Sequence, residues 1–325
     1  MATMDPTLGE LFVLTLLRAQ VAATVAILAV AGLRDPVRRL AGPGVAYRLW
    51  GLVPAAGISS LFPTLAEFMG RDNLLGLAPI QASDPLMRAL SDDGFWSGWA
   101  QGLTWVWLAG GLGLALLFLR AELAFRRLAG LGLAGPAIVG VASPRLVVPW
   151  DYKVRFTQIE RGFIRRHERA HMQRRDNLAN LLITGVQVLG WFNPLIHLAA
   201  SAARLDQEAA CDAQVLDGRP RERRAYAEAL LKAHCSGPNS GLVSAWSASS
   251  GRVGKRHPLE WRLSLLARPE PSLRRYVAGV ALVGTLAVTM SAAVWTLAPR
   301  RQGAQVGFHR LPIRELVVLF CRSRR

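Results

Sequence analysis

Cysteine is scarce in this chain of 325 residues, and its few cysteines exclude two classes of site. The three cysteines, Cys211, Cys235 and Cys321, show no paired spacing, which argues against a disulfide-stabilised scaffold. They also form no CxxC pair of the kind that holds structural zinc. A glycine-rich loop that could cradle phosphate is missing as well, and so are internal repeats. Any catalytic chemistry must therefore come from other residues.

Acidic residues are also in short supply, because 22 Asp and Glu face 39 Lys and Arg, giving a net charge of +17. Such an excess fits nucleic acid, acidic lipid headgroups or positively charged cytoplasmic loops. Residues 120–275 alone carry 25 Lys and Arg against 13 Asp and Glu, a net of +12. No nucleic-acid recognition motif accompanies these charges. The mean hydropathy of +0.24 is high for a soluble protein. We therefore expect a partner in the lipid bilayer and no direct binding of nucleic acid.

Four apolar stretches are long enough to cross a bilayer, which takes about 20 residues. They lie at about 8–33, 45–68, 99–119 and 277–297. The first ten residues contain acids and no base, so we interpret the first stretch as a retained helix rather than a cleaved signal peptide. The predicted organisation is three membrane helices within 1–119, a domain over 120–276, a fourth membrane helix over 277–298 and a short basic tail over 299–325.

The positive charges predict the orientation of these helices. Arginines follow the first stretch, the loop 70–98 is mainly acidic, and the segment 120–275 is strongly basic. The positive-inside rule then places the N-terminus outside and the large domain in the cytoplasm, in a plasma membrane of the bacterial inner-membrane type. The tail after residue 298 carries seven arginines and does not fit this topology. The alternative for the tail is a basic segment that lies on lipid headgroups.

The domain sequence predicts helices together with one short pair of strands. Two β-branched runs surround Ser143 and Pro144 within "AIVGVASPRLVVP", which indicates a strand, a turn and a strand over 137–149. One long helix is expected from about 156 to 190, ending before the Pro194 of "WFNPL". Two further helices are expected over about 194–216 and 221–234, followed by a Ser- and Gly-rich loop over 236–254.

The segment "RRHERAHMQRRDN" contains an HExxH motif. A helical turn takes 3.6 residues, so His167 and His171 lie on one helix face and can bind one ion. Glu168 lies about 100° around the helix from His167, where it can contact a water on the ion but is badly placed to ligate. The pattern predicts a zinc hydrolase site with two ligands and a general base. The alternative is a pair of exposed histidines on an arginine-rich helix.

A catalytic zinc ion usually has three protein ligands. In "LDQEAACDAQVL", Glu208 and Asp212 are four residues apart and share a helix face. Glu208 can be the third ligand, and Asp212 can accept the spare N–H of a ligating histidine. The alternative is an ordinary acidic helix face. His197 lies on an apolar helix and is expected to be a packed, hydrogen-bonded histidine.

Four segments in this order resemble the BlaR/MecR family of integral-membrane zinc metallopeptidases: "GVASPRLVVPWDY", "RRHERAHMQRRDN", "WFNPL" and "LDQEAACDAQVL". HExxH alone is shared by many peptidases, whereas its combination with a downstream ExxxD and the WFNP break is more restrictive. The resemblance implies a mainly α protein. Its four-helix transmembrane bundle would carry a cytoplasmic gluzincin-like α+β zinc peptidase domain, inserted between the third and fourth helices.

The resemblance also implies the roles of the site residues. His167, His171 and Glu208 would bind one Zn²⁺ ion, Glu168 would act as the general base, and Asp212 would support a ligand. Asp176 matches another acid of the family, and a surface salt bridge at a helix N-terminus is its alternative.

The implied activity is that of a membrane-embedded metalloendopeptidase, with a peptide or protein as its partner. It would cleave itself, a cytoplasmic transcriptional repressor, or both. A housekeeping peptidase that clears membrane peptides is one alternative, and a non-catalytic signalling scaffold is another. Antibiotic-sensing family members carry a penicillin-binding sensor domain after the last helix. The tail here contains no SxxK motif, so we expect a member that lacks this sensor.

Overall fold

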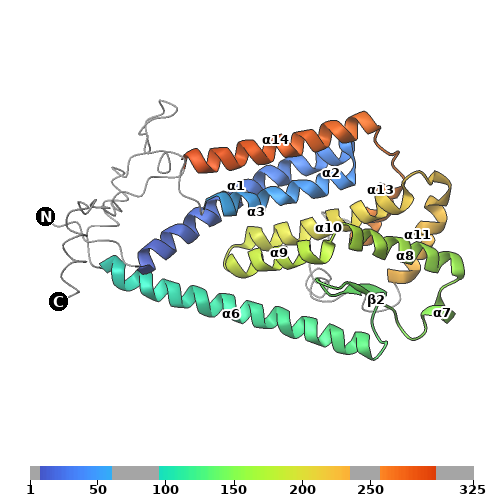
Figure 1. Ribbon diagram of the computed structural model, residues 1–325, viewed down its shortest axis with the longest axis horizontal. Coiled ribbons are helices and arrows are strands. Elements are labelled where there is room, and N and C mark those ends of the chain that lie inside the picture. Colours follow the sequence, from blue (N-terminus) through green and yellow to red (C-terminus); the bar gives the residue numbers. More distant parts are fainter. Residues whose placement is uncertain (1–7, 61–94, 235–256, 298–325) are drawn as a thin grey trace, which may run out of the picture.

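The computed structural model describes residues 8–60, 95–234 and 257–297. Within these ranges the chain is mainly helical, with two short strands (Figure 1). In chain order the elements are α1 (Leu8–Ala41), α2 (Pro43–Arg48), η1 (Leu49–Gly51), α3 (Leu52–Ser59), α6 (Phe95–Gly130), β1 (Ala137–Val139), β2 (Arg145–Val147), α7 (Tyr152–Arg155), α8 (Gln158–Gln173), α9 (Asp176–Leu189), α10 (Pro194–Leu216), η2 (Pro220–Glu222), α11 (Arg223–His234), α13 (Pro258–Leu266) and α14 (Leu273–Leu297).

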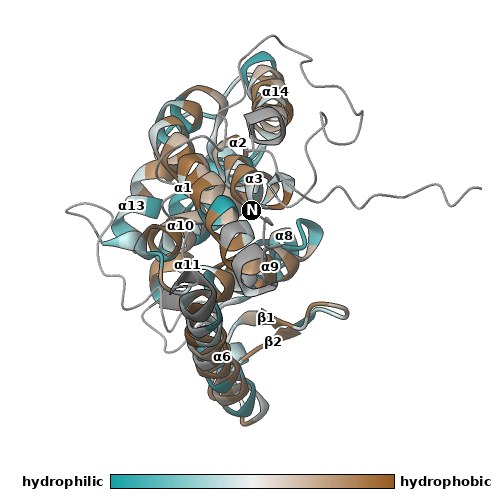
Figure 2. Ribbon diagram, turned by 90° about the vertical axis from the view of Figure 1, so that its left-hand side faces the viewer, coloured by the Kyte–Doolittle hydropathy of each residue, from teal (hydrophilic) through white to brown (hydrophobic). Residues whose placement is uncertain are grey.

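Three of the described helices are long and apolar enough to cross a bilayer. The candidate spans are Thr15–Ala41 in α1, Trp99–Gly130 in α6 and Leu273–Ala293 in α14. Figure 2 shows hydrophobic residues along much of α6. Three of the four predicted apolar stretches are thereby confirmed as long helices. The remaining stretch, 45–68, is described only up to residue 60, where α2, η1 and α3 lie against α1. The four-helix bundle therefore stays a prediction.

The main apolar core joins the N-terminal helices to both α14 and α10. Val30 and Leu49 are fully buried in it, together with Ile196 and Ala203 from α10. Close packing of α14 requires glycine at 279, because a Cβ atom there would lie 2.4 Å from the Cβ of Ala41. This core attaches a helix of the predicted domain directly to the membrane helices.

The predicted strand, turn and strand are confirmed. β1 and β2 pair in antiparallel register, with Ala137 opposite Val147 and Val139 opposite Arg145. The side-chain amide of Asn177 donates to the carbonyl of Gly140 at 2.6 Å and so attaches the strand pair to α9. The predicted helix over 194–216 coincides with α10, and the one over 221–234 corresponds to α11. The predicted loop 236–254, most of the loop 70–98 and the basic tail lie outside the described residues.

The single long helix predicted over 156–190 is wrong, because the structure forms two helices, α8 and α9. Arg175 adopts the left-handed conformation (φ 56°) and turns the chain between them. Asp176 then begins α9 with its carboxylate buried. The apolar periodicity continues through the break, so it gives no sign of it. The physical reason for the break is tertiary: the turn brings Asp176 back toward the last turn of α8.

Candidate metal centre

Helix α8 holds the HExxH motif and begins at a capping box. The backbone N–H of Glu160 donates to the Thr157 hydroxyl at 3.3 Å, and the Thr157 N–H donates to the Glu160 carboxylate at 2.7 Å. This exchange satisfies two N–H groups at the start of the helix. One helical turn separates His167 from His171, so both imidazoles project from one face. Their Nε2 atoms lie 3.2 Å apart.

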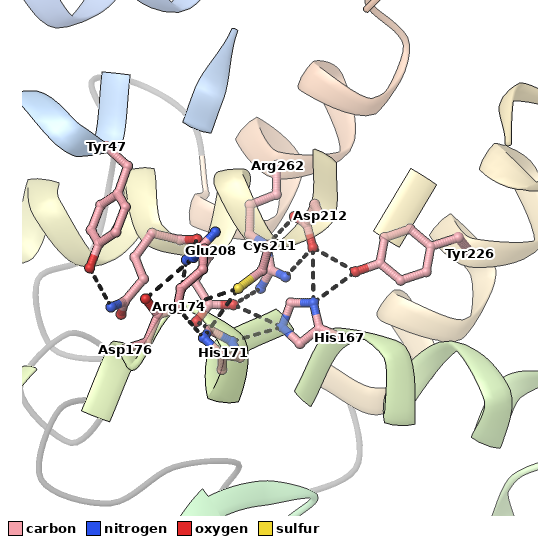
Figure 3. A network of polar contacts seen from close by, with 11 residues as sticks. Tyr47, His167, His171, Arg174, Asp176, Glu208, Cys211, Asp212, Tyr226 and Arg262 are labelled. Atoms are coloured by element: carbon pink, nitrogen blue, oxygen red, sulfur yellow. Dashed lines mark hydrogen bonds and ion pairs between the residues drawn. The ribbon is translucent and has the colours of Figure 1, made fainter. Parts of the chain in front are cut away.

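The carboxylate of Glu208 on α10 meets the two imidazoles (Figure 3). One of its oxygens lies 3.4 Å from His167 Nε2, and the other lies 3.6 Å from His171 Nε2. In a tetrahedral zinc site with bonds of about 2.0–2.1 Å, neighbouring ligand atoms are about 3.3 Å apart. The spacing of these three groups therefore fits one ion held between them.

The other nitrogen of each imidazole contacts a group of the protein. His171 Nδ1 lies 2.7 Å from the carboxylate of Asp176, which is 1% exposed. His167 Nδ1 lies 2.9 Å from the Tyr226 hydroxyl, and that hydroxyl donates to Asp212 at 2.7 Å. Each Nδ1–H thus has an acceptor, so in the neutral imidazole, the form that binds a metal, the lone pair lies on Nε2.

These contacts bear on the alternatives left open for the two aspartates. Asp176 does form the salt bridge considered as its alternative, because Arg174 donates to its carboxylate at 2.6 Å. This salt bridge is buried rather than at the surface, and the same carboxylate also contacts His171. Burial alone would lower the pKa of His171, but its hydrogen bonds with Asp176 and Cys211 raise it well above the usual value. The side chain of Asp212 is also buried. Its oxygen lies 3.4 Å from His167 Nδ1, and the shorter link between them passes through the Tyr226 hydroxyl.

Sequence reasoning missed Arg262, which comes from α13 and lies between two acids of the site. Its guanidinium donates to both oxygens of Asp212, at 2.8 and 2.7 Å, and lies 3.0 Å from an oxygen of Glu208. Burial alone would raise the pKa of Glu208, but Arg262 and the imidazoles hold it well below its usual range. Glu208 therefore stays ionised, as a metal ligand must be. Tyr226 was missed too, and neither residue belongs to a motif that could have revealed it.

Cys211 is a further sulfur donor close to the imidazoles. Ligand atoms of His167, His171 and Cys211 lie within 4.8 Å of one another, which makes this cysteine a competitor for the third ligand position. Its sulfur, however, lies 3.2 Å from Nδ1 of His171, the nitrogen that already contacts Asp176. Burial also raises the pKa of the Cys211 thiol to about 12, which disfavours the thiolate. The geometry therefore favours Glu208.

Glu168 follows His167 on α8, and its side chain is 9% exposed. Burial raises the pKa of its carboxyl group, while the neighbouring imidazoles of His167 and His171 act in the opposite direction. A carboxyl group with a raised pKa is suited to take up and release a proton near neutral pH. The two histidines are not the exposed pair of the alternative interpretation, because their side chains are only 13% and 14% exposed.

Two residues directly before Glu208 anchor α10 to the N-terminal helices. The Gln207 amide donates to the Tyr47 hydroxyl of α2 at 2.9 Å. Asp206, which is fully buried, accepts from three side chains: Arg34 at 3.2 Å, Arg38 at 2.8 Å and the Trp50 indole at 2.8 Å. Helices α1 and α2 therefore help to set the position of Glu208.

The family model described as BlaR1 peptidase M56 matches residues 14–131 and 128–266. The chain belongs to this family. The two matches include the imidazoles, Glu208 and Arg262 of the candidate metal centre. Membership in the BlaR1 peptidase family, together with three helices that are long and apolar enough to cross a bilayer, indicates a membrane-associated protein of the metallopeptidase class at the level of the family. A metal cofactor is implied at the level of the family.

Individual relatives of this BlaR1-family chain match over shorter stretches. The regulatory protein BlaR1 of Bacillus licheniformis is 30% identical over 101 residues, which are 31% of this chain and 17% of the relative. The methicillin resistance mecR1 protein of Staphylococcus aureus is 29% identical over 98 residues, which are 30% of this chain and 17% of the relative. The matched part of this chain thus spans about a sixth of the length of each of these relatives.

Proposed function

We propose that this chain is a membrane-embedded zinc metalloendopeptidase whose single Zn²⁺ ion is bound by His167, His171 and Glu208. The proposal is carried by the convergence of three ligand groups, with atoms 3.2 to 3.6 Å apart, at one point. Imidazole and carboxylate donors in this number are typical of catalytic zinc. Membership in the BlaR1 peptidase family supports the metallopeptidase class.

The residues around this point can perform peptide hydrolysis. A zinc ion bound here supplies Lewis acidity, which makes a water molecule acidic near neutral pH and polarises a peptide carbonyl. The Glu168 carboxylate accepts a proton from the attacking water as the new C–O bond forms. It then returns this proton to the amine nitrogen as the C–N bond breaks. Arg262 meanwhile keeps Glu208 ionised and holds Asp212 against Tyr226.

The proposed substrates are the chain itself, a cytoplasmic transcriptional repressor, or both, within a signalling pathway. This part of the proposal is supported by the regulatory relatives and by the basic character of residues 120–275, which favours the cytoplasmic side of the membrane. A housekeeping peptidase would use the same chemistry on other membrane peptides. The two functions differ only in the proteins that are cut.

A comparison of two variants with the parent chain tests this function. Glu168→Gln removes the proton acceptor and keeps the ligands, so we expect unchanged zinc content and cleavage reduced by about 10² to 10⁴-fold. Glu228→Gln, at an exposed position of α11, is the matched control and should behave as the parent. New protein N-termini would be compared by mass spectrometry in cells that produce each form.

Fragments that depend on Glu168 but not on Glu228 would identify the substrates. A repressor fragment among them supports the regulatory role, whereas membrane-peptide fragments alone support the housekeeping role. Identical fragments from all three forms would show that Glu168 is not the base.

A further inference from the structure

Helix α9 and the first half of α10 form a hairpin that differs from the rest of the predicted domain. Residues 177–203 contain no Asp, Glu, Lys or Arg. A helical hairpin that faces water normally carries charged side chains on its outer surface. This hairpin instead exposes six large apolar side chains: Leu178, Leu181, Leu182, Leu189, Phe192 and Leu198. Its outer surface is thus apolar, like that of a membrane helix.

One side of the hairpin runs along the membrane helix α1. At the tip, the Asn193 amide donates to the Thr24 hydroxyl at 3.1 Å. Further along α10, Asp206 is bound to Arg38. Thr24 lies inside the apolar stretch Thr15–Ala41, so the tip lies beside the interior of a membrane-crossing segment.

The other side of the hairpin contacts α6 (Figure 1). The Trp107 indole donates to the carbonyl of Leu189 at 2.9 Å, and the Trp191 indole donates to the carbonyl of Trp107 at 3.1 Å. Gly110 permits this contact, because a Cβ atom there would lie 2.3 Å from the Trp191 ring. The backbone of α6 and the tip of the hairpin are therefore in direct contact.

The depth of the tip follows from the geometry of the helices. Along α6, the first charged residue after Trp107 toward the C-terminal end of the helix is Arg120. It lies 13 positions further on, which is about 20 Å of helix. Helix α9 has 14 residues and a length of about 21 Å. Its start at Asp176 therefore lies near the level of Arg120. The tip would reach well into a hydrocarbon layer of about 30 Å.

Polar groups near the tip of the hairpin are paired, as a hydrocarbon environment requires, whereas the side-chain oxygen of Asn180 and two nitrogens of Arg204 have no hydrogen-bond partner among the described residues. The carbonyl of Leu189, at the end of α9, accepts from Trp107 and from the Gln20 amide of α1 at 3.5 Å. Gln187, which is fully buried, contacts His197 Nδ1 at 3.2 Å and accepts from Arg204 at 2.9 Å. Water would solvate the end of a surface helix, whereas inside lipid these groups need partners from neighbouring helices. His197 is thus a hydrogen-bonded histidine, as predicted.

We propose that α9 and the first half of α10 form a re-entrant hairpin inside the bilayer, whose exposed leucines contact lipid acyl chains. The hairpin surface continues the apolar surface of α1 and α6, and this continuity favours lipid as its partner. The candidate metal centre then lies at the edge of the hydrocarbon layer, beside the start of α9. The segment 120–276 is accordingly not wholly cytoplasmic. This proposal does not depend on peptidase activity.

Spin labels on single cysteines can test the depth of the hairpin. The full chain, with Cys235 and Cys321 replaced by Ser, would be reconstituted in phosphatidylcholine and phosphatidylglycerol vesicles. Labels at Leu178, Leu182 and Leu189 sample about 16 Å along α9. Ile159, an exposed apolar residue of α8, is the matched control. Collisions with oxygen, which partitions into lipid, would be compared with collisions with a water-soluble nickel chelate. The chain with Cys235 and Cys321 replaced and no cysteine introduced keeps only the buried Cys211, and it measures any background labelling.

The proposal expects oxygen collisions to rise and nickel collisions to fall from position 178 to position 189, with nickel dominant at Ile159. Nickel collisions at positions 182 and 189 equal to those at Ile159 would place the hairpin in water and overturn the proposal. Low collisions with both reagents, together with spin–spin broadening between chains, would show a second copy in place of lipid and would overturn it too. A label at Leu198 on α10 replaces any α9 variant that fails to fold.

Discussion

At each imidazole of the centre, one nitrogen is engaged by the protein and the other faces Glu208. Asp176 engages His171 directly, whereas Tyr226 relays the contact from His167 to Asp212. An acceptor at Nδ1 fixes the tautomer and the ring orientation, so little reorganisation is needed when a metal binds. These contacts would thus hold both rings in the orientation that binding to one shared ion requires.

The choice between Glu208 and Cys211 as third ligand can be tested by truncating each side chain to alanine. Glu208→Ala should lose the bound zinc, because two imidazoles alone make an incomplete site. Cys211→Ala should retain one zinc per chain, with affinity lowered by about tenfold or less. The thiol contacts Nδ1 of His171, the nitrogen that does not face the proposed ion. Metal content and competition titration would measure both. Retention by Glu208→Ala together with loss by Cys211→Ala would reverse the assignment.

At the scale of elements, α10 connects the membrane helices with the candidate ligand Glu208. Its first half packs in the core beside α1, and its second half carries Glu208 and Asp212. Asp206 lies at the junction and binds two arginines of α1. A displacement of α1 would therefore be transmitted to Glu208 two residues further along.

Asp206→Asn should destabilise the fold by about 3 kcal/mol, because it leaves the nearly buried Arg38 with less charge compensation. Asp35→Asn removes a second partner of the same arginine but lies at an exposed position, so it should cost less than about 1 kcal/mol. Thermal unfolding in detergent would compare the two variants. Equal stabilities would show that the Asp206 cluster does not hold α10.

Packing between α6 and the hairpin depends on a missing side chain at residue 110. Gly110→Ala should cost about 1–3 kcal/mol, since the new methyl group would overlap the Trp191 ring. Gly113→Ala on the same helix meets no atom within 4 Å, so it should be neutral or stabilise by up to about 1 kcal/mol through helix propensity. The melting temperatures of the two variants would be compared. A Gly110→Ala protein as stable as Gly113→Ala would show that Gly110 and the Trp191 ring are not closely packed.

At the scale of the whole molecule, the candidate centre lies where the membrane helices join the remaining helices. The positive-inside rule predicts that this side is cytoplasmic and that the N-terminus is outside. A cysteine at Ile159 should react with an impermeant maleimide in inverted vesicles but not in intact cells. A cysteine at Ala2 should show the opposite behaviour. The reverse pattern would contradict the predicted topology.

The HExxH and ExxxD patterns were visible in the sequence because helical periodicity is local and brings residues four apart onto one face. The groups around them were not. Arg262 and Tyr226 reach the site from helices whose own sequences carry no motif. The break between α8 and α9 was missed, since a single left-handed residue at Arg175 leaves no trace in the apolar pattern.

The sequence by itself determined the three long apolar helices, the strand pair, and the spacing of the two histidines and two acids. These features depend on composition and on contacts within single elements. Only the tertiary structure decided which acid meets which imidazole, how Arg262 joins two of them, and where the α9–α10 hairpin lies. Helices of this length are too short to reveal from hydropathy whether they lie in a protein core or in lipid. That distinction rests on contacts between residues far apart in the chain.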